Sequence, residues 1–319
     1  MSEDVNVEHL LDIFASIDPG LDDIWNACCL FMTHLYWFKP RETVLGSKIE
    51  GLPDDHPFKL GCLFWLSMLF DPVGNHTEQK RLLTHTLKLA RQWGSEPWIT
   101  LTIRQLSDVN RVLGGREEGI KQAKEALEIS ERLGDTIEQA RCLDGLAWLL
   151  LADKQFNAAG DAASRAIDLI SGKDQKHLVC QLHRVLGEIC LGKGEREKAA
   201  HHFETALGIA SPFDWRDELY WIHFCLACIF CDGDKLDSAN AHIEQAKLHT
   251  FDGTYKLGRA MKAQACYWGR QGRLEEAKSE AFRALEVFEK LGAAKDVEEC
   301  RSLLQETEKA TESRLTRRR

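Results

Sequence analysis

A leucine followed by a small residue recurs along the chain at a fixed spacing. Successive units lie 40 residues apart, and the sixth follows after 38: Leu66-Ser67, Leu106-Ser107, Leu146-Ala147, Leu186-Gly187, Leu226-Ala227 and Gln264-Ala265. A second set keeps the same phase: Thr86-Leu87, Ala126-Leu127, Ala166-Ile167, Ala206-Leu207, Ala246-Lys247 and Ala284-Leu285. Periods of this length are typical of stacked helical hairpins, which bury a continuous core between neighbouring repeats.

Within each period the pattern predicts a first helix, a turn and a second helix. The first helix carries the leucine and the small residue, and the small side chain allows a neighbouring helix to approach closely. Turn positions often hold glycine, as at Gly194, because glycine readily adopts the positive φ of a helix end. Lys154 occupies the equivalent position in one unit. The second helix has small residues four and seven positions apart, which share one helix face, as in Ala159, Ala163 and Ala166.

The pattern predicts an all-α fold, a right-handed superhelical solenoid of about six to seven hairpins with a period of roughly 40 residues. Residues 1–55 are expected to form a helical cap or a degenerate first repeat, or to pack on a partner domain. Residues 56–306 form the repeat array. Residues 307–319 have no periodicity and are expected to form a disordered basic tail. Its arginines, Arg314 and 317–319, are too few to separate a localisation signal or acidic-partner patch from a solvated tail.

The repeat resembles the tetratricopeptide repeat (TPR). Its frame is most complete in one unit, at Leu186, Gly187, Gly194, Ala199, Phe203, Ala206 and Pro212. Other units depart from the frame, with Lys154 in place of the turn glycine and Gln264 in place of the leucine. The period exceeds the roughly 34 residues of that family and matches the length of HEAT and armadillo repeats, but the small-residue frame favours the tetratricopeptide interpretation. The resemblance covers about residues 57–304.

Three segments also resemble the C-terminal TPR arrays of fungal proteins, at residues 145–170, 179–215 and 284–305. Such arrays often follow a NACHT or NB-ARC nucleotide-binding domain in signal-transducing ATPases of the STAND type. The resemblance therefore implies a sensor or scaffold role. The chain has no GxxxxGK[ST] phosphate loop, so no nucleotide switch is carried over. It is expected to be either a free-standing array or a fragment of a longer protein.

Composition narrows the class of partner and the compartment. The 41 basic and 50 acidic residues give a net charge of −9, which argues against a general nucleic-acid binder. No apolar run approaches the ~18 residues of a membrane span. The acidic start, MSEDVNVEHLL, is unlike a signal peptide. The 11 cysteines form no disulfide framework, so reduced thiols and a cytoplasmic location, with the nucleus as an alternative, are expected.

Catalysis and metal binding find little support in the motifs. Cys225, Cys228 and Cys231 have the Cys-x-x-Cys spacing that serves zinc binding or thiol exchange. They lie inside a first helix, no second such pair exists, and a buried cysteine also packs as a small hydrophobe. The histidines look scattered, with His183 isolated and His202 on the outer face of a second helix. We therefore predict a protein without enzymatic activity, bound metal or cofactor.

The resemblance implies a ligand groove lined by the first helices at fixed distances from the small residue. The positions that map to it are Arg104, Asp108, Arg111, Arg141, Asp144, Trp148, Arg184, Glu188, Trp221, Phe224, Arg259 and Lys262. Arginine can bind carboxylate or phosphate through two hydrogen bonds, and the aromatic residues could anchor apolar side chains. The alternative is that these charges pair with one another across adjacent helices.

The sequence thus favours a non-catalytic scaffold that binds a protein or peptide with acidic or phosphorylated groups, either alone or as the sensor array of a signalling ATPase. A regulatory domain that binds a small anionic ligand is the alternative. The resemblance disfavours one specific partner. Chaperone-binding tetratricopeptide domains place an asparagine directly after the small residue, and none of the six units has it.

Overall fold

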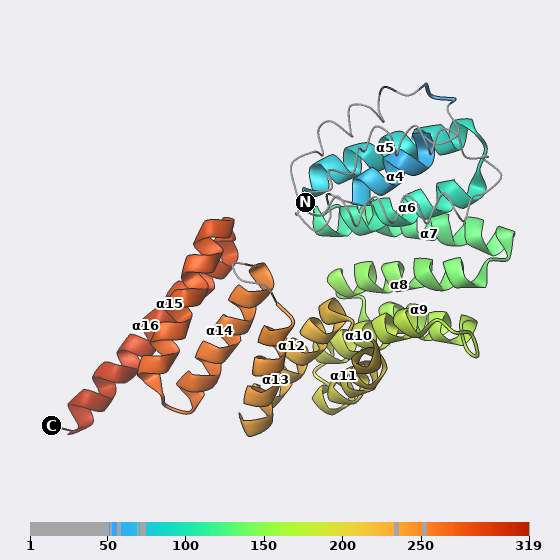
Figure 1. Ribbon diagram of the computed structural model, residues 1–319. Coiled ribbons are helices and arrows are strands. Elements are labelled where there is room, and N and C mark those ends of the chain that lie inside the picture. The colour runs from blue at the N-terminus through green and yellow to red at the C-terminus, as the bar shows by residue number, and fades with distance from the viewer. Residues whose placement is uncertain are drawn as a thin grey trace, which may run out of the picture. The chain divides into compact units, whose positions relative to one another are not determined.

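The computed structural model describes residues 51, 53–55, 59–68, 70, 75–232, 236–250 and 254–318. Over these ranges the chain forms thirteen α helices and one short 3₁₀ helix, and no strand (Figure 1). The predicted all-α fold of helical hairpins is therefore confirmed. The cap or degenerate repeat expected for residues 1–55 lies almost entirely outside the described residues.

The chain divides into two compact units, Met1–Ser171 and Gly172–Arg319, here called unit 1 and unit 2. The hairpins of unit 1 are α4 (Lys59–Met68) with α5 (His76–Gln92), α6 (Glu96–Val112) with α7 (Arg116–Leu133), and α8 (Thr136–Ala152) with α9 (Phe156–Leu169). Those of unit 2 are α10 (Lys176–Gly192) with α11 (Arg196–Ala210), α12 (Arg216–Asp232) with α13 (Leu236–Leu248), and α14 (Tyr255–Arg270) with α15 (Leu274–Leu291), followed by α16 (Ala294–Arg318). The 3₁₀ turn Ser211–Phe213 follows α11.

The first helices keep a common register within each unit. From α6 to α14 they begin at residues 96, 136, 176, 216 and 255. Consecutive first helices touch one another, α6 with α8 in unit 1, and α10 with α12, α12 with α14 and α14 with α16 in unit 2. Side chains at equivalent positions of neighbouring first helices are therefore brought onto one face, which we call the first-helix face of each unit.

The turns inside the hairpins use the left-handed backbone conformation that the glycines predict. Gly194 has φ +79°, and the next amide, of Glu195, donates to the Cys190 carbonyl at 2.8 Å. Lys154 takes the same conformation with φ +59°, and the Gln155 amide donates to the Leu150 carbonyl at 2.9 Å. The two turns therefore have the same hydrogen bond, but in Lys154 the left-handed conformation crowds a Cβ atom.

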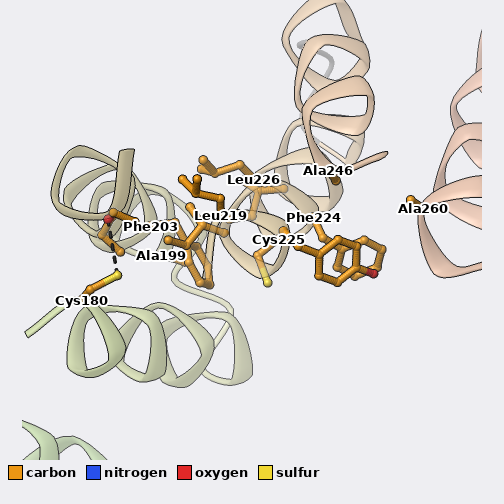
Figure 2. Packing of buried hydrophobic residues seen from close by; sticks show 14 of the residues in the cluster. Cys180, Ala199, Phe203, Leu219, Phe224, Cys225, Leu226, Ala246 and Ala260 are labelled. Atoms are coloured by element: carbon orange, nitrogen blue, oxygen red, sulfur yellow. Dashed lines mark hydrogen bonds between the residues drawn. The ribbon is translucent and has the colours of Figure 1, made fainter. Parts of the chain in front are cut away.

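At Gly187 the repeat needs a small residue because the second helix of the hairpin packs directly against this position. An ideal Cβ built on Gly187 would lie 2.7 Å from Cζ of Phe203, which is fully buried on α11. Phe203 belongs to a hydrophobic cluster that runs from Cys180 on α10 to Ala260 on α14. Figure 2 shows Phe203 close to Leu219 and Leu226 of α12. The glycine thus makes room for the ring that connects α11 to the core of unit 2.

The end of the chain differs from the expected disordered tail, because α16 continues to Arg318. Cys300 and Leu304 of α16 pack in one hydrophobic cluster with Phe288 of α15. Further along, Thr307 is buried, and Lys278 of α15 forms an ion pair with Glu308 at 2.8 Å. The packing against α15 therefore extends past residue 306, and the good helix formers that follow allow the helix to continue.

Candidate functional site

The twelve candidate residues divide evenly between the two units. Unit 1 holds those on α6 and α8: Arg104, Asp108, Arg111, Arg141, Asp144 and Trp148. Unit 2 holds those on α10, α12 and α14: Arg184, Glu188, Trp221, Phe224, Arg259 and Lys262. Ten of them are half-buried, Arg141 is exposed and Phe224 is buried. Each group can therefore be described as one surface within its own unit.

In unit 1 two of the arginines meet the same carboxylate. Arg104 Nε donates to Glu138 Oε1 at 2.7 Å, and Arg141 Nη1 donates to Glu138 Oε2 at 3.4 Å. The Arg104 and Glu138 side chains are only 14% and 12% exposed. Burial favours the neutral form of Arg104, but the charges of Glu138 and Asp108 outweigh it and raise its pKa above the ordinary value. These guanidinium groups are therefore already engaged inside the protein.

Arg111 of unit 1 is held differently. Its guanidinium carbon lies 5.9 Å from the ring centroid of Trp148, on the neighbouring first helix. Among the described residues, its buried Nε atom has no hydrogen-bond acceptor. Arg111 is thus positioned against an aromatic ring and not against a described acid.

In unit 2, Arg184 and Lys262 repeat the ion pairing seen in unit 1. Arg184 Nε lies 3.2 Å from Glu218 Oε2, whose side chain is 8% exposed. Lys262 Nζ lies 2.9 Å from Asp296 and 2.5 Å from Glu299, both on α16. Arg104, Arg184 and Lys262 are thus paired with acids on a neighbouring helix, as the alternative of pairing across adjacent helices expects, although these acids are not themselves mapped positions. Arg141 instead pairs within its own helix, with an acid three residues away.

The acids that pair with Arg104 and Arg184 are not at the helix positions that the resemblance maps to a ligand groove. Glu138 and Glu218 each lie nine residues before the small residue of their unit, in the first turn of α8 and α12. Acidic residues are common in a first helical turn, where they meet the positive end of the helix dipole. An acid at these positions therefore has an ordinary explanation in the sequence, and only the contact between first helices reveals that Glu138 and Glu218 also bind arginine.

Three residues of unit 2 form a distinct arrangement, here called the Arg259 platform: Trp221 and Phe224 of α12, and Arg259 of α14. The Arg259 guanidinium carbon lies 4.4 Å from the ring centroid of Phe224 and 5.2 Å from that of Trp221. The two rings meet edge to face, with centroids 6.3 Å apart and planes at 87°. In Figure 2, Phe224 lies on the side of α12 nearer Ala260, the residue that follows Arg259 on α14.

A buried tyrosine packs against both aromatic residues of the platform. Tyr220 is fully buried, stacks on Phe224 with centroids 6.0 Å apart, and meets Trp221 edge to face at 5.0 Å. Its hydroxyl donates to the Lys256 carbonyl of α14 at 2.9 Å. The aromatic side of the platform is thus tied to both first helices.

The guanidinium of Arg259 makes no hydrogen bond or ion pair within the described part of the chain, where it lies against the rings of Phe224 and Trp221. The acid that its charge influences is Asp296. That carboxylate already accepts hydrogen bonds from Lys262 Nζ at 2.9 Å and from the Tyr255 hydroxyl at 2.8 Å. Arg259 therefore differs from the paired basic residues of the first-helix faces.

The histidines of unit 2 form pairs that the sequence analysis did not anticipate. The Nδ1 atoms of His183 and His202 lie 3.2 Å apart, and those of His223 and His242 lie 2.8 Å apart, so one neutral ring can donate to the other. Each pair joins the two helices of one hairpin. Placing His183 in isolation and His202 on an outer face was therefore wrong. The sequence contains a sign of this pairing, because histidine recurs 40 residues after both members of the first pair, at His223 and His242.

The cysteines of α12 serve packing in the structure. Cys225 and Cys231 are buried and Cys228 is half-buried. Burial, and then the neighbouring Glu188, raise the pKa of the Cys225 thiol well above its ordinary value, and Cys225 Sγ donates to Glu188 at 3.3 Å. Within the described ranges no group of three or more His, Cys, Asp or Glu side chains is placed to hold a metal ion. The absence of bound zinc remains a prediction.

Neither a protein-family model nor a curated protein matches the chain. Solved structures do. A Rap protein complexed with Competence and Sporulation Factor has a TM-score of 0.63 at 14% identity, over 84% of this chain and 80% of that one. Cut9 in the APC/C hetero-tetramer Cut9–Hcn1 has a TM-score of 0.63 at 13% identity, over 88% and 52%. A STAND protein with a tetratricopeptide repeat sensor from Pyrococcus horikoshii has a TM-score of 0.58 at 16% identity, over 74% and 36%.

At such low identities these similarities define the fold alone. The fold is of the tetratricopeptide-repeat type, as the repeat frame predicts. In addition, no helix of the described residues is long and apolar enough to cross a bilayer.

Proposed function

We propose that the chain is a non-catalytic binding module that takes up a protein or peptide segment on the first-helix face of unit 2. The observation that supports this most is the series of half-buried aromatic and charged side chains that α10, α12 and α14 place side by side. Stacked hairpins commonly bind along such an extended surface. Half-buried tryptophan and arginine side chains are also the types that contribute most to binding at protein interfaces.

The similar structures support the same class of function. The Rap protein was crystallised with Competence and Sporulation Factor, and Cut9 assembles with Hcn1 in a hetero-tetramer. In the Pyrococcus horikoshii protein a tetratricopeptide array is the sensor of a signal-transduction ATPase. The chain spans about a third of that protein, 36% of its length. We therefore propose a sensor array of a signalling ATPase as the more specific form of the binding role.

A regulatory domain for a small anion is the second candidate, and Arg111 in unit 1 favours it. Its Nε is buried without an acceptor among the described residues, so a small anion that reached it would supply the missing hydrogen-bond acceptor. A series of thermal unfolding curves with acetate, phosphate and sulfate tests this candidate. An increase in Tm that saturates with one anion and is lost in Arg111→Gln supports it, and an unchanged Tm with all three rejects it.

The main proposal is tested by peptide selection followed by photo-crosslinking. A random peptide library displayed on phage is selected against the immobilised chain. A photoreactive amino acid is then placed at Cys266, which is exposed on the first helix α14, or at Phe282, which is exposed on the second helix α15. We expect selected peptides to crosslink at residue 266 and not at 282. Crosslinking only at 282 would move the site to the second helices, and failure to select any binding peptide would reject the peptide-binding role.

A further inference from the structure

We propose that the Arg259 platform is a carboxylate-binding site, which holds an aspartate or glutamate side chain, or the terminal carboxylate, of the docked peptide. The inference rests on the proposed function, because it assumes that a peptide occupies the first-helix face of unit 2. It adds the chemical group that this face selects and the residue that selects it.

Contact with aromatic rings holds the guanidinium of Arg259 without using its hydrogen-bond donors. Its carbon atom lies 4.4 Å from the Phe224 centroid and 5.2 Å from the Trp221 centroid, and because these two rings stand at 87° to each other the flat group can stack on no more than one of them. The N–H groups lie in the plane and point away from its edges, in a fork that matches the two oxygens of a carboxylate. Because no described residue accepts from them, a ligand carboxylate would not have to displace an internal partner.

The platform is organised before a ligand arrives. Trp221 and Phe224 belong to the hydrophobic cluster of unit 2, and buried Tyr220 packs against both. An arginine already held on rings loses less conformational freedom on binding than one extended into solvent, and this favours affinity. Half-buried Trp221 also offers apolar surface beside the charge. A carboxylate attached to an aliphatic side chain or a peptide terminus would use both features.

The surrounding charges favour a carboxylate over a phosphate. Two lysines lie close to the platform, but Lys262 is paired with Asp296 and Glu299, and Lys256 with Asp217 at 2.6 Å. Arg259 is thus left to balance a single negative charge. A phosphate monoester carries about −1.5 to −2 at neutral pH and would stand near the acids of α16 with one cation to hold it. A monoanionic carboxylate matches that charge.

The equivalent position in unit 1 shows why the site belongs to unit 2. Arg141 of α8 lies in the same register position as Arg259, six residues before the small residue. Its guanidinium donates to Glu138, which also binds Arg104. The same residue type at the same register is therefore paired with an acid in unit 1 and has no described acid partner in unit 2.

A double-mutant cycle on the full chain tests the inference. Peptides selected on the wild type are synthesised with each aspartate or glutamate replaced by its amide, with an amidated C-terminus, and with phosphoserine in place of the acid. Their Kd values are measured by fluorescence anisotropy for the wild type, Arg259→Gln and Arg259→Lys. Lys290→Gln is the control, because Lys290 is exposed on α15 outside the first-helix face. Circular dichroism melting of each variant checks that the fold is kept.

We expect one acid-to-amide change to weaken binding to the wild type about tenfold, as a charge-assisted pair would. The same change should have no effect in Arg259→Gln, and Arg259→Lys should bind the acidic peptide at an intermediate affinity. Lys290→Gln should behave as the wild type. The inference is overturned if the acid-to-amide loss persists in Arg259→Gln, if no acid matters, or if phosphoserine peptides bind more tightly. Each of these outcomes leaves peptide binding in place, whereas absence of any binding would reject the proposed function itself.

Discussion

The hairpins α8–α9 of unit 1 and α10–α11 of unit 2 share one register and are packed with different side chains. Where α8–α9 has Ala147 and Ala163, both fully buried, α10–α11 has Gly187 and the fully buried Phe203. In α10–α11 the glycine of the first helix accommodates the large ring of the second, whereas in α8–α9 both positions hold a methyl group. The comparison shows that the period decides which positions meet, while the side chains decide how the space between them is filled.

A second pair of interior positions is apolar in α8–α9 and polar in α10–α11. Leu143 and Ala162 are buried in α8–α9, and the equivalent positions in α10–α11 hold the paired His183 and His202. The next hairpin of unit 2 repeats the histidine pair. Hairpins that share one register are therefore expected to differ in their response to acid.

The largest effect is expected where Phe203 meets Gly187. Phe203→Ala should lower the free energy of unfolding by about 3–5 kcal/mol, because it opens a cavity in the core. Gly187→Ala should cost about 1–3 kcal/mol, because its Cβ would overlap the ring. The double variant recreates the Ala–Ala pair of α8–α9 and should cost less than the two single changes added together. Urea unfolding measures all three, and strict additivity would show that the two positions do not share one contact.

The ion pairs of unit 1 come next. Glu138→Leu places in α8 the residue that α10 has at this position, Leu178, and leaves the half-buried Arg104 without its carboxylate. Loss of one partner of such a shielded pair typically costs about 3 kcal/mol or more. Adding Arg104→Leu to Glu138→Leu removes both charges from the contact, and this double variant should recover part of the lost stability. If Glu138→Leu unfolds at the wild-type urea concentration, the pair contributes nothing to unit 1.

The histidine pairs predict a dependence on acid in unit 2. Burial, and then the neighbouring His242, lower the pKa of His223 to about 4, and burial also lowers the pKa of His183, His202 and His242. The unfolded chain has histidines near 6.5 and so binds more protons than the folded one between those values. The contribution of the neutral histidine pairs to the free energy of unfolding is therefore complete above about pH 6.5 and is lost as the pH falls toward 4.

The neighbouring charges modify this response without reversing it. His201 faces the first pair and opposes its protonation, whereas Glu204 faces His242 and favours it. His249 stacks on His223, beside Asp214 and Arg216. Hydrogen exchange at pH 7.0 and 4.5 should show helices α10–α13 losing protection before α6–α9. A variant with His183→Leu, His202→Ala, His223→Leu and His242→Ala should lose that difference, and an equal response of both groups of helices in the wild type would contradict the prediction.

The smallest effect is expected at the turns. Lys154 holds the left-handed conformation that Gly194 holds in the next hairpin. Lys154→Gly removes the crowding of Cβ, which stabilises the turn, but it also makes the unfolded chain more flexible, which offsets part of the gain. The net effect should be to stabilise unit 1 by about 1 kcal/mol. Gly194→Lys should destabilise unit 2 by a similar amount. Thermal unfolding of the two variants checks both signs, and a loss of stability in Lys154→Gly would mean that its side chain stabilises the turn.

The sequence predicted the fold because the constraints are local and repeated. Gly187, Ala199 and Ala206 recur in register, and only one helical arrangement buries them together. The availability of individual arginines could not be predicted in this way. Arg104 and Arg259 look alike along the chain, but the acid that closes Arg104 comes from the next first helix, 34 residues away, and no described acid does the same for Arg259. Such pairing depends on three-dimensional contact between repeats.

The end of the array was misjudged for a related physical reason. The tail 307–319 lacks the small-residue frame, which marks helices packed on both sides. A last helix needs only one packed side. Thr307 is buried and Glu308 pairs with Lys278 of α15, and neither feature belongs to the small-residue frame. The array therefore extends past residue 306 within α16.

The central claim is that the first-helix face of unit 2 holds the ligand at Arg259. The most direct measurement follows the Nε–Hε resonances of the arginine side chains by nuclear magnetic resonance while a selected peptide is added, with Arg259 assigned through Arg259→Lys. The account predicts that the Arg259 resonance shifts and saturates with the Kd found by anisotropy, while that of Arg104, already bonded to Glu138, stays in place. An unmoved Arg259 resonance in the saturated complex would contradict the account.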